Sequence, residues 1–254
     1  AWDKLAPQTP HVVERIGELY RKLEQWEPLA AFYQKNLEHI QAQGGDESEA
    51  ELEELSFKLA VLLFEELDRV EDATTMFGGI LASNVEHQPS VAFLERHGGS
   101  GQTGVDNLLE KVYSWQGHWQ KLLDLLEAKL EETVDLVDRS QLYQRIADVY
   151  EHNLLLIDSA LTTLQKAVQD NPADEDLLEC LEALAKRNNI WLDCVETLDH
   201  ILASQSDVVI KQNLLKRVGR ICAEELDELD DAGVGDNMHR ALKLLGQKRH
   251  GTPR

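Results

Sequence analysis

The chain has 254 residues, of which 43% are hydrophobic and 6% aromatic, with 15 glycines and 6 prolines. This composition allows a buried core and favours helix over sheet. Its formal charge of −22, from 25 Lys and Arg against 47 Asp and Glu, repels phosphate backbones and anionic membranes, so we expect neither nucleic acid nor membrane as a partner.

Cysteine usage and hydropathy indicate the compartment. The three cysteines, Cys180, Cys194 and Cys222, are odd in number and widely spaced, which fits neither a disulfide framework nor a metal or redox pair. No apolar run approaches the ~18 residues needed to span a bilayer, and the start of the chain lacks a basic segment followed by an apolar one. We expect a reducing, cytoplasmic location.

One helical motif recurs along the chain. An aliphatic residue is followed by a small one, and a Tyr or an apolar residue comes three positions later; on a helix these residues share a face with a notch for a neighbouring helix. The four copies are Ile16-Gly17-x-x-Tyr20, Leu59-Ala60-x-x-Leu63, Ile146-Ala147-x-x-Tyr150 and Val218-Gly219-x-x-Cys222.

Each copy is followed nine or ten residues later by an apolar anchor, a distance that fits the end of one helix, a short turn and the start of the next. Trp119 and Trp191 open similar segments, and we expect the recurring tryptophans to be interhelical core. The six anchors are Trp26, Val70, Trp119, Ile157, Trp191 and Leu229. They predict six helical hairpins.

The spacing of the anchors locates the insertions. The last three steps are 38, 34 and 38 residues, whereas the first two are 44 and 49. The excess fits loop-like sequence at 41–48 and in the region from Gln88-Pro89 to Gly104. The run 98–104 is rich in glycine but lacks the Lys-Ser or Lys-Thr of a phosphate loop, so we interpret it as a linker or loop.

The fourth hairpin resembles a tetratricopeptide repeat, on the residues Ile146-Ala147-x-x-Tyr150, Asp158-Ser159-Ala160-x-x-x-Leu164-x-x-Ala167 and Pro172. In that family two antiparallel helices pack through small residues, here Ala147, Ala160 and Ala167, and a proline closes the unit. The resemblance implies an all-α fold, a right-handed α-solenoid of about six antiparallel hairpins. The 38-residue steps exceed the usual 34 of the family, which leaves a related helical-repeat class open.

The predicted organisation has four parts. Residues 1–97 form hairpins with an extra helical segment, 98–104 a linker or loop, 105–233 further hairpins, and 234–254 a capping helix and basic tail. This last part has five basic residues and one acidic residue, a net charge of +4, which leaves −26 upstream.

Nothing in the sequence assembles a catalytic constellation. The nine histidines show no H-x-x-H or H-x-x-x-H pair on one helix face, so we expect no metal site and no cofactor. Cys194 and Cys222 fall on apolar stripes, which favours core packing over a nucleophilic role. The chain is therefore predicted not to be an enzyme.

Two groups of residues are candidates for partner binding. The helical register places acidic and polar side chains on the groove formed by the first helices, namely Glu14, Glu18, Gln144, Asp148, Glu151 and Glu179. Phe57, Val61 and Phe64 point to the same side, where they are covered either by the segment 90–94 or by a partner. Internal packing is favoured, because exposed apolar patches of that size are uncommon.

The predicted function is a protein-interaction scaffold or adaptor that binds a basic or amphipathic segment of another protein in its groove. This follows from the family resemblance, since tetratricopeptide proteins mostly organise complexes. The alternative is a regulatory or targeting region of a larger enzyme whose catalytic domain lies elsewhere.

Overall fold

The computed structural model describes residues 10–43, 48–99 and 103–225. Within these ranges the chain forms twelve α-helices and one π-helical turn, with no strand among them. The prediction of an all-α fold is confirmed. The chain divides into two compact units, an N-terminal unit (Ala1–Leu125) and a C-terminal unit (Leu126–Arg254), which are described separately.

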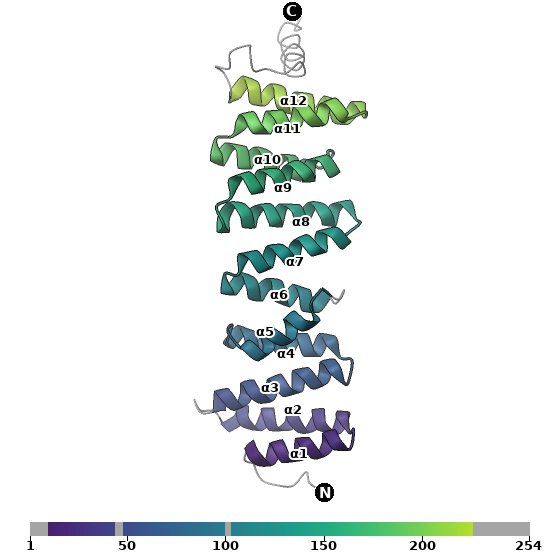
Figure 1. Cartoon of the computed structure of the whole chain (residues 1–254), viewed down its shortest axis with the longest axis vertical. Coiled ribbons are helices and arrows are strands. Elements are labelled where there is room, and N and C mark those ends of the chain that lie inside the picture. Colours follow the sequence, from purple (N-terminus) through teal and green to yellow (C-terminus); the bar gives the residue numbers. More distant parts are fainter. Residues whose placement is uncertain (1–9, 44–47, 100–102, 226–254) are drawn as a thin grey trace, which may run out of the picture. The chain divides into compact units, whose positions relative to one another are not determined.

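The N-terminal unit begins with two hairpins. They are formed by α1 (Pro10–Lys22) with α2 (Trp26–Gln43), and by α3 (Ser48–Glu65) with α4 (Val70–Ser83). Each helix packs against the next (Figure 1). The buried side chains recur at helical spacing, as in Leu29, Tyr33 and Leu37 of α2, so hydrophobic burial between neighbours holds the hairpins together.

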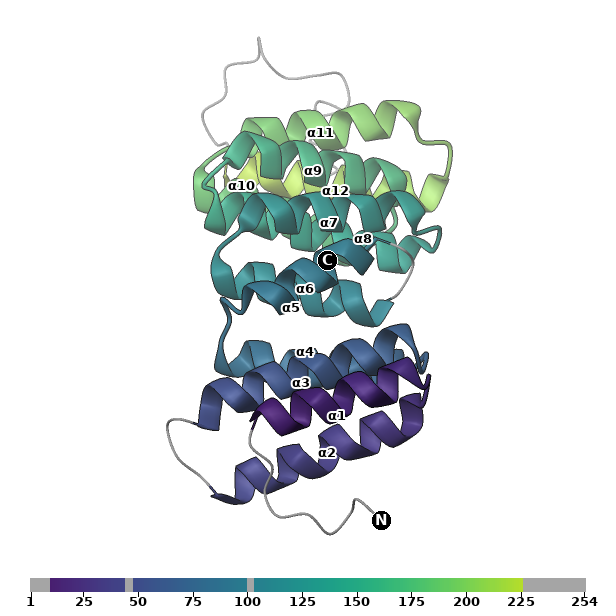
Figure 2. The ribbon, with the colours of Figure 1, turned by 60° about the horizontal axis from the view of Figure 1, so that its bottom comes forward.

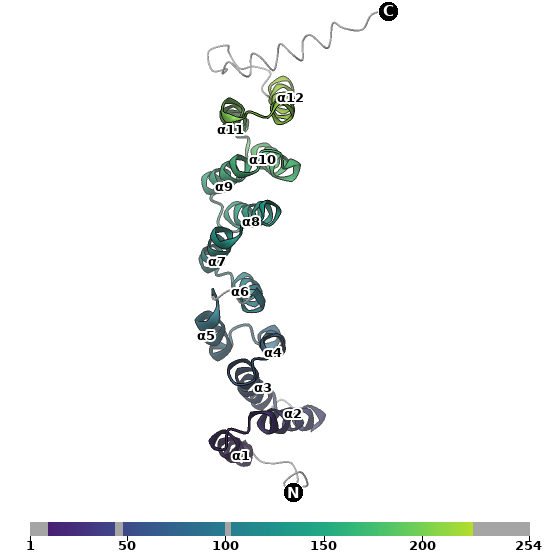
Figure 3. The ribbon, with the colours of Figure 1, turned by 90° about the vertical axis from the view of Figure 1, so that its right-hand side faces the viewer.

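A short additional helix, α5 (Gln88–His97), changes the alternation in this unit. It precedes α6 (Thr103–Gln116), which packs against both α4 and α5. In Figure 3, α1, α3 and α5 lie on one side of the unit and α2, α4 and α6 on the other. Because the anchor Trp119 begins the second helix of a hairpin, the spacing predicts that the preceding helix, α6, is a first helix. It lies instead on the side of the second helices α2 and α4, because α5 is an additional helix between α4 and α6.

The C-terminal unit contains the end of α7 (Trp119–Glu132) and five further helices. These are α8 (Leu136–Asp148), continued by the π-helical turn η2 (Val149–Asn153), then α9 (Ile157–Asp170), α10 (Glu175–Asn188), α11 (Trp191–Ser204) and α12 (Val208–Glu224). From α8 onward each helix packs against the next (Figure 2). One apolar core runs through the unit and includes Ala147, Ala160 and Ala167, the small residues of the repeat resemblance.

Five of the six sequence anchors are the first residues of helices: Trp26, Val70, Trp119, Ile157 and Trp191 begin α2, α4, α7, α9 and α11. The sixth, Leu229, lies outside the described residues, as do residues 234–254. Trp191 is buried, but Trp26 and Trp119 are only partly buried. The expectation of a core role common to all three tryptophans is therefore correct in full for Trp191 alone.

The turns before these helices share a backbone feature. In each, the residue two positions before the anchor has a positive φ, between 52° and 69°. These left-handed residues are Glu24, Asp68, Gly117, Leu155 and Asn189. Glycine and asparagine adopt this conformation readily, whereas leucine does so at a cost. The repeated feature is therefore the left-handed backbone conformation of the turn, and the residue types at that position differ from one turn to the next.

Candidate functional site

Four of the nine predicted partner-binding residues, Glu14, Glu18, Phe57 and Val61, line two adjacent cavities in the N-terminal unit. The cavities lie along α1, α2 and α3 and share Arg21, Tyr33 and Lys58. We call the pair the α1–α3 cleft. Of the predicted residues, the structure brings together these four, while Phe64 of the same helix α3 lines neither cavity.

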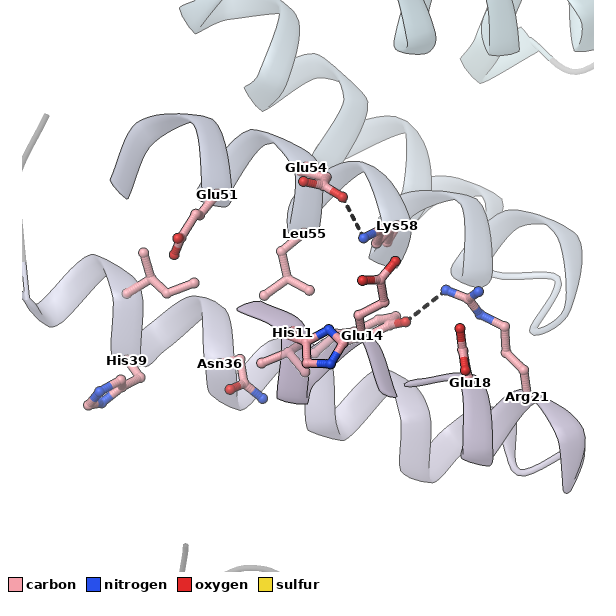
Figure 4. Close-up of a pocket in the computed structure, with 13 residues that line it drawn as sticks. His11, Glu14, Glu18, Arg21, Asn36, His39, Glu51, Glu54, Leu55 and Lys58 are labelled. Carbon is pink, nitrogen blue, oxygen red and sulfur yellow. Dashed lines mark hydrogen bonds and ion pairs between the residues drawn. The ribbon is translucent and has the colours of Figure 1, made fainter. Parts of the chain in front are cut away.

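The first cavity of the α1–α3 cleft has a volume of about 320 Å³. Side chains of α1 and α3 line it from two sides, and α2 contributes the residues between them (Figure 4). Its acidic members are Glu14 and Glu18 from α1 and Glu51 and Glu54 from α3. Apolar contacts come from Val13, Tyr33, Ile40 and Leu55. The cavity therefore combines a negative rim with apolar surface.

The charges of this cavity are only partly compensated. Lys58 Nζ lies 2.6 Å from Glu54 Oε1, and Arg15 on the outside of α1 lies 2.9 Å from a Glu18 carboxylate oxygen. Glu14 and Glu51 are exposed and form no ion pair within the described part of the chain. The cavity therefore has two carboxylates, one on α1 and one on α3, that are available to a cation.

The second cavity, also about 320 Å³, is more apolar. Trp26, Leu29, Phe57, Val61 and Leu62 contribute to its lining, and Glu65 and Glu66 add exposed carboxylates. Where the cavities meet, the Arg21 guanidinium donates a hydrogen bond of 2.9 Å to the Tyr33 hydroxyl (Figure 4). This bond holds the Arg21 guanidinium beside Tyr33, and within the described residues Arg21 forms no ion pair with Glu14 or Glu51.

The sequence interpretation missed Glu51 and Glu54. They lie three residues apart on α3, with Leu55 and Lys58 on the same helical face. That spacing was a usable signal. The spacing does not give the position of α1, and this face of α3 borders a cavity only because α1 lies opposite it.

Phe57 and Phe64 pack beneath α5. The Phe93 ring centroid lies 6.5 Å from that of Phe57 and 5.3 Å from that of Phe64, both edge to face. His97 also contacts Phe64, at 4.8 Å between centroids. The favoured expectation, internal packing under segment 90–94, is confirmed for these two rings. Phe64 is buried and is therefore not accessible to a partner, while Phe57 and Val61 remain partly exposed.

Glu151 has a structural role instead of the predicted groove position. It lies on η2 and is 7% exposed. Its two carboxylate oxygens accept hydrogen bonds from Arg187 at 2.8 and 2.6 Å, and Asn188 donates a third at 3.0 Å. The bonds from Arg187 lower the pKa of Glu151. The prediction of a steering role is wrong here because a side chain of α10 already neutralises this carboxylate.

The other predicted residues of the C-terminal unit do not line the α1–α3 cleft. Gln144 is partly exposed on α8, and Asp148 and Glu179 are exposed. Asp148, Glu151 and His152 bring three possible metal ligands within 4.8 Å of one another. A cation there would compete with the Arg187 guanidinium for Glu151, so this cluster gives no basis for a metal site.

The cysteine thiols belong to the packing. Cys194 and Cys222 are buried, and Cys180 is partly buried. Burial raises the pKa of Cys194 to about 12 and that of Cys222 to about 11. Both thiols are therefore protonated at neutral pH and poor nucleophiles, which agrees with the predicted core role. Among the described helices, none is long and apolar enough to cross a membrane.

Comparison with known proteins adds little. No family model matches the chain, and no curated protein is similar to it. A solved structure described as a functional characterization of Pseudomonas aeruginosa pilF is 14% identical, with 95% of this chain and 92% of that chain covered and a TM-score of 0.33. This score is too low for the match to inform either fold or function.

Proposed function

We propose that the chain is a protein-interaction scaffold of the tetratricopeptide type, and that its α1–α3 cleft binds a basic or amphipathic segment of another protein. The observation that supports this most directly is the adjacency of the two cavities. One presents Glu14 and Glu51, which have no ion-pair partner among the residues that the structure describes, and the next presents the partly exposed Phe57 and Val61. Binding, and not catalysis, is the activity that such a surface suits.

The two cavities have separable roles in this proposal. Carboxylates on the rim attract a cationic segment over the distance of charge screening, which raises the association rate. Apolar contacts with Phe57 and Val61 exclude water and slow dissociation. Each cavity is the size of a small binding pocket, so the pair accommodates a few side chains of an extended or helical segment.

The acidic residues outside the cleft contribute to the negative potential of the chain but not to direct contacts in this proposal. Asp148 and Glu179 are exposed on the C-terminal unit, and Gln144 is partly exposed. They add to the negative potential of a chain whose charge is −22, which favours encounter with a basic partner at low ionic strength. We assign them no direct contact with the segment bound in the α1–α3 cleft.

Charge reversal in the cleft tests the proposal. Proteins retained by the immobilised chain are compared between the unaltered sequence, the pair Glu14→Lys with Glu51→Lys, and the matched control pair Glu131→Lys with Glu132→Lys on α7. Both pairs add the same charge at exposed positions. A cleft partner is lost from the first pair and retained by the second.

Binding kinetics of the purified partner then separate the contribution of the carboxylates to association from that of the apolar residues to dissociation. Raising ionic strength from about 0.05 M to 0.5 M shortens the screening length from about 14 Å to 4 Å and should slow association several-fold. Val61→Ala should mainly speed dissociation. Partners that bind all three proteins equally, with kinetics independent of salt, would show that the cleft is not the binding site.

A further inference from the structure

The sequence itself contains a segment with the chemistry that the α1–α3 cleft requires. Residues 234–254 lie outside the described part of the structure, and their pattern is known from sequence alone. The segment has net charge +4, with Arg240, Lys243, Lys248 and Arg249 among its cations. Met238, Ala241, Leu242 and Leu245 are spaced i, i+3, i+4 and i+7, the spacing by which an amphipathic helix presents apolar anchors to a groove.

We infer that residues 234–254 of one copy bind the α1–α3 cleft of a second copy, so that the chain associates head to tail. This inference rests on the proposed function and identifies its partner as the chain's own basic segment. Charge complementarity supports it, since the segment has a charge of +4 and the rest of the chain a charge of −26.

The complementarity extends to the two cavities. Lysine and arginine have long apolar stems with a charged end, so their stems suit Leu55 and Ile40 while the charges reach Glu14 or Glu51. Leucines of the segment suit the second cavity beside Phe57 and Val61. The segment therefore matches the cleft in two ways. Its cations match the carboxylates of the first cavity, and its apolar stripe matches the apolar second cavity.

The segment that occupies the cleft belongs to a second copy. Every copy of the chain has both the basic segment and the acidic cleft. A second copy can therefore offer its cleft to the segment of the first and its own segment to a third copy. Such a contact joins two different surfaces, a heterologous interface that closes a ring or extends a chain of copies.

The first experiment uses a fluorescent peptide of residues 234–254 and measures its anisotropy. The binding protein is the full chain with Arg240→Gln, Lys243→Gln, Lys248→Gln and Arg249→Gln, so that its own segment does not compete. Adding Glu14→Lys and Glu51→Lys should weaken binding about tenfold or more, and adding Glu131→Lys and Glu132→Lys less than about twofold, because only the first pair lies at the site. A scrambled peptide of equal charge should also bind about tenfold more weakly.

The second experiment asks which copy supplies the segment. Sedimentation of the unaltered chain should show association that rises with concentration. The cleft variant (Glu14→Lys with Glu51→Lys) and the segment variant (the four substitutions to Gln) should each be monomeric alone, whereas their mixture should form a one-to-one complex, because each retains the surface that the other lacks. An unaltered chain that stays monomeric while the peptide binds would show occupancy within one chain and overturn the inference.

Failure of this inference can be told apart from failure of the proposed function. A designed lysine and leucine helix serves as an unrelated cationic amphipathic probe against the same proteins. If this helix binds in a manner dependent on Glu14 and Glu51 while peptide 234–254 does not bind, the head-to-tail inference is wrong and the proposed function stands. If neither binds, both are wrong.

Discussion

The hydroxyl of Tyr33 on α2 lies against the backbone of Gly17 on α1, so closely that a Cβ at position 17 would lie 2.5 Å from the hydroxyl oxygen. Gly17 is the small residue of the first repeat motif. Its lack of a side chain lets α2 approach α1 and places Tyr33 where Arg21 donates its hydrogen bond. The same contact positions one part of the lining of the α1–α3 cleft.

Gly17→Ala should therefore destabilise the N-terminal unit by about 1–3 kcal/mol, because the clash outweighs the gain in helix propensity. Gly79→Ala on α4 is the matched control: a Cβ there has nothing within 4 Å, so the free energy of unfolding should rise by about 0.5–1 kcal/mol. Urea denaturation measures both. Combining Gly17→Ala with Tyr33→Phe should recover part of the loss, and a Gly17→Ala protein as stable as the Gly79→Ala protein would contradict the close contact.

The left-handed turns predict opposite effects of two reciprocal substitutions. Leu155→Asn should stabilise the C-terminal unit by about 1 kcal/mol and Asn189→Leu should destabilise it by about as much, because the left-handed conformation disfavours leucine and is tolerated by asparagine. Leu155 is 75% exposed, so little packing is lost. Thermal unfolding of both variants provides the measurement, and shifts of the same sign would exclude this explanation.

Stability of the C-terminal unit should fall in acid through Glu151. Its pKa in the folded chain is lowered from 4.5, chiefly by the hydrogen bonds from Arg187. A carboxylate with a lowered folded pKa contributes stability that is complete above its unfolded pKa and is lost as the pH falls through the folded value. Urea titrations at several pH values between about 7 and 3 should show a smaller loss for Glu151→Gln than for the unaltered chain. Equal acid losses would mean that Glu151 makes no such contribution.

The tryptophans at equivalent positions should differ in importance. Trp191 is 7% exposed within the core of the C-terminal unit, so Trp191→Ala should cost about 3–5 kcal/mol. Trp119 is only partly buried, and Trp119→Ala should cost about 1–2 kcal/mol, less than a fully buried tryptophan would. Denaturant unfolding followed by circular dichroism measures the free energy of unfolding of both variants. A larger decrease for Trp119→Ala than for Trp191→Ala would contradict this prediction.

The sequence alone determined the all-α fold and the first residues of several helices. The anchors Trp26, Val70, Ile157 and Trp191 each begin a helix, because hydrophobic periodicity and turn sequences act over a few neighbouring residues. The notch at Gly17 was predictable for the same reason.

The tertiary structure decided what lies opposite each helical face. Glu151 appears groove-facing in a helical register, but Arg187, 36 residues away, buries and neutralises it. Phe64 is covered by α5, and α6 changes layer because α5 intervenes. Glu51 borders a cavity only because α1 and α3 lie on either side of the same stretch of α2. Burial and charge compensation depend on contacts between residues far apart in the chain, and helical periodicity contains no information about those contacts.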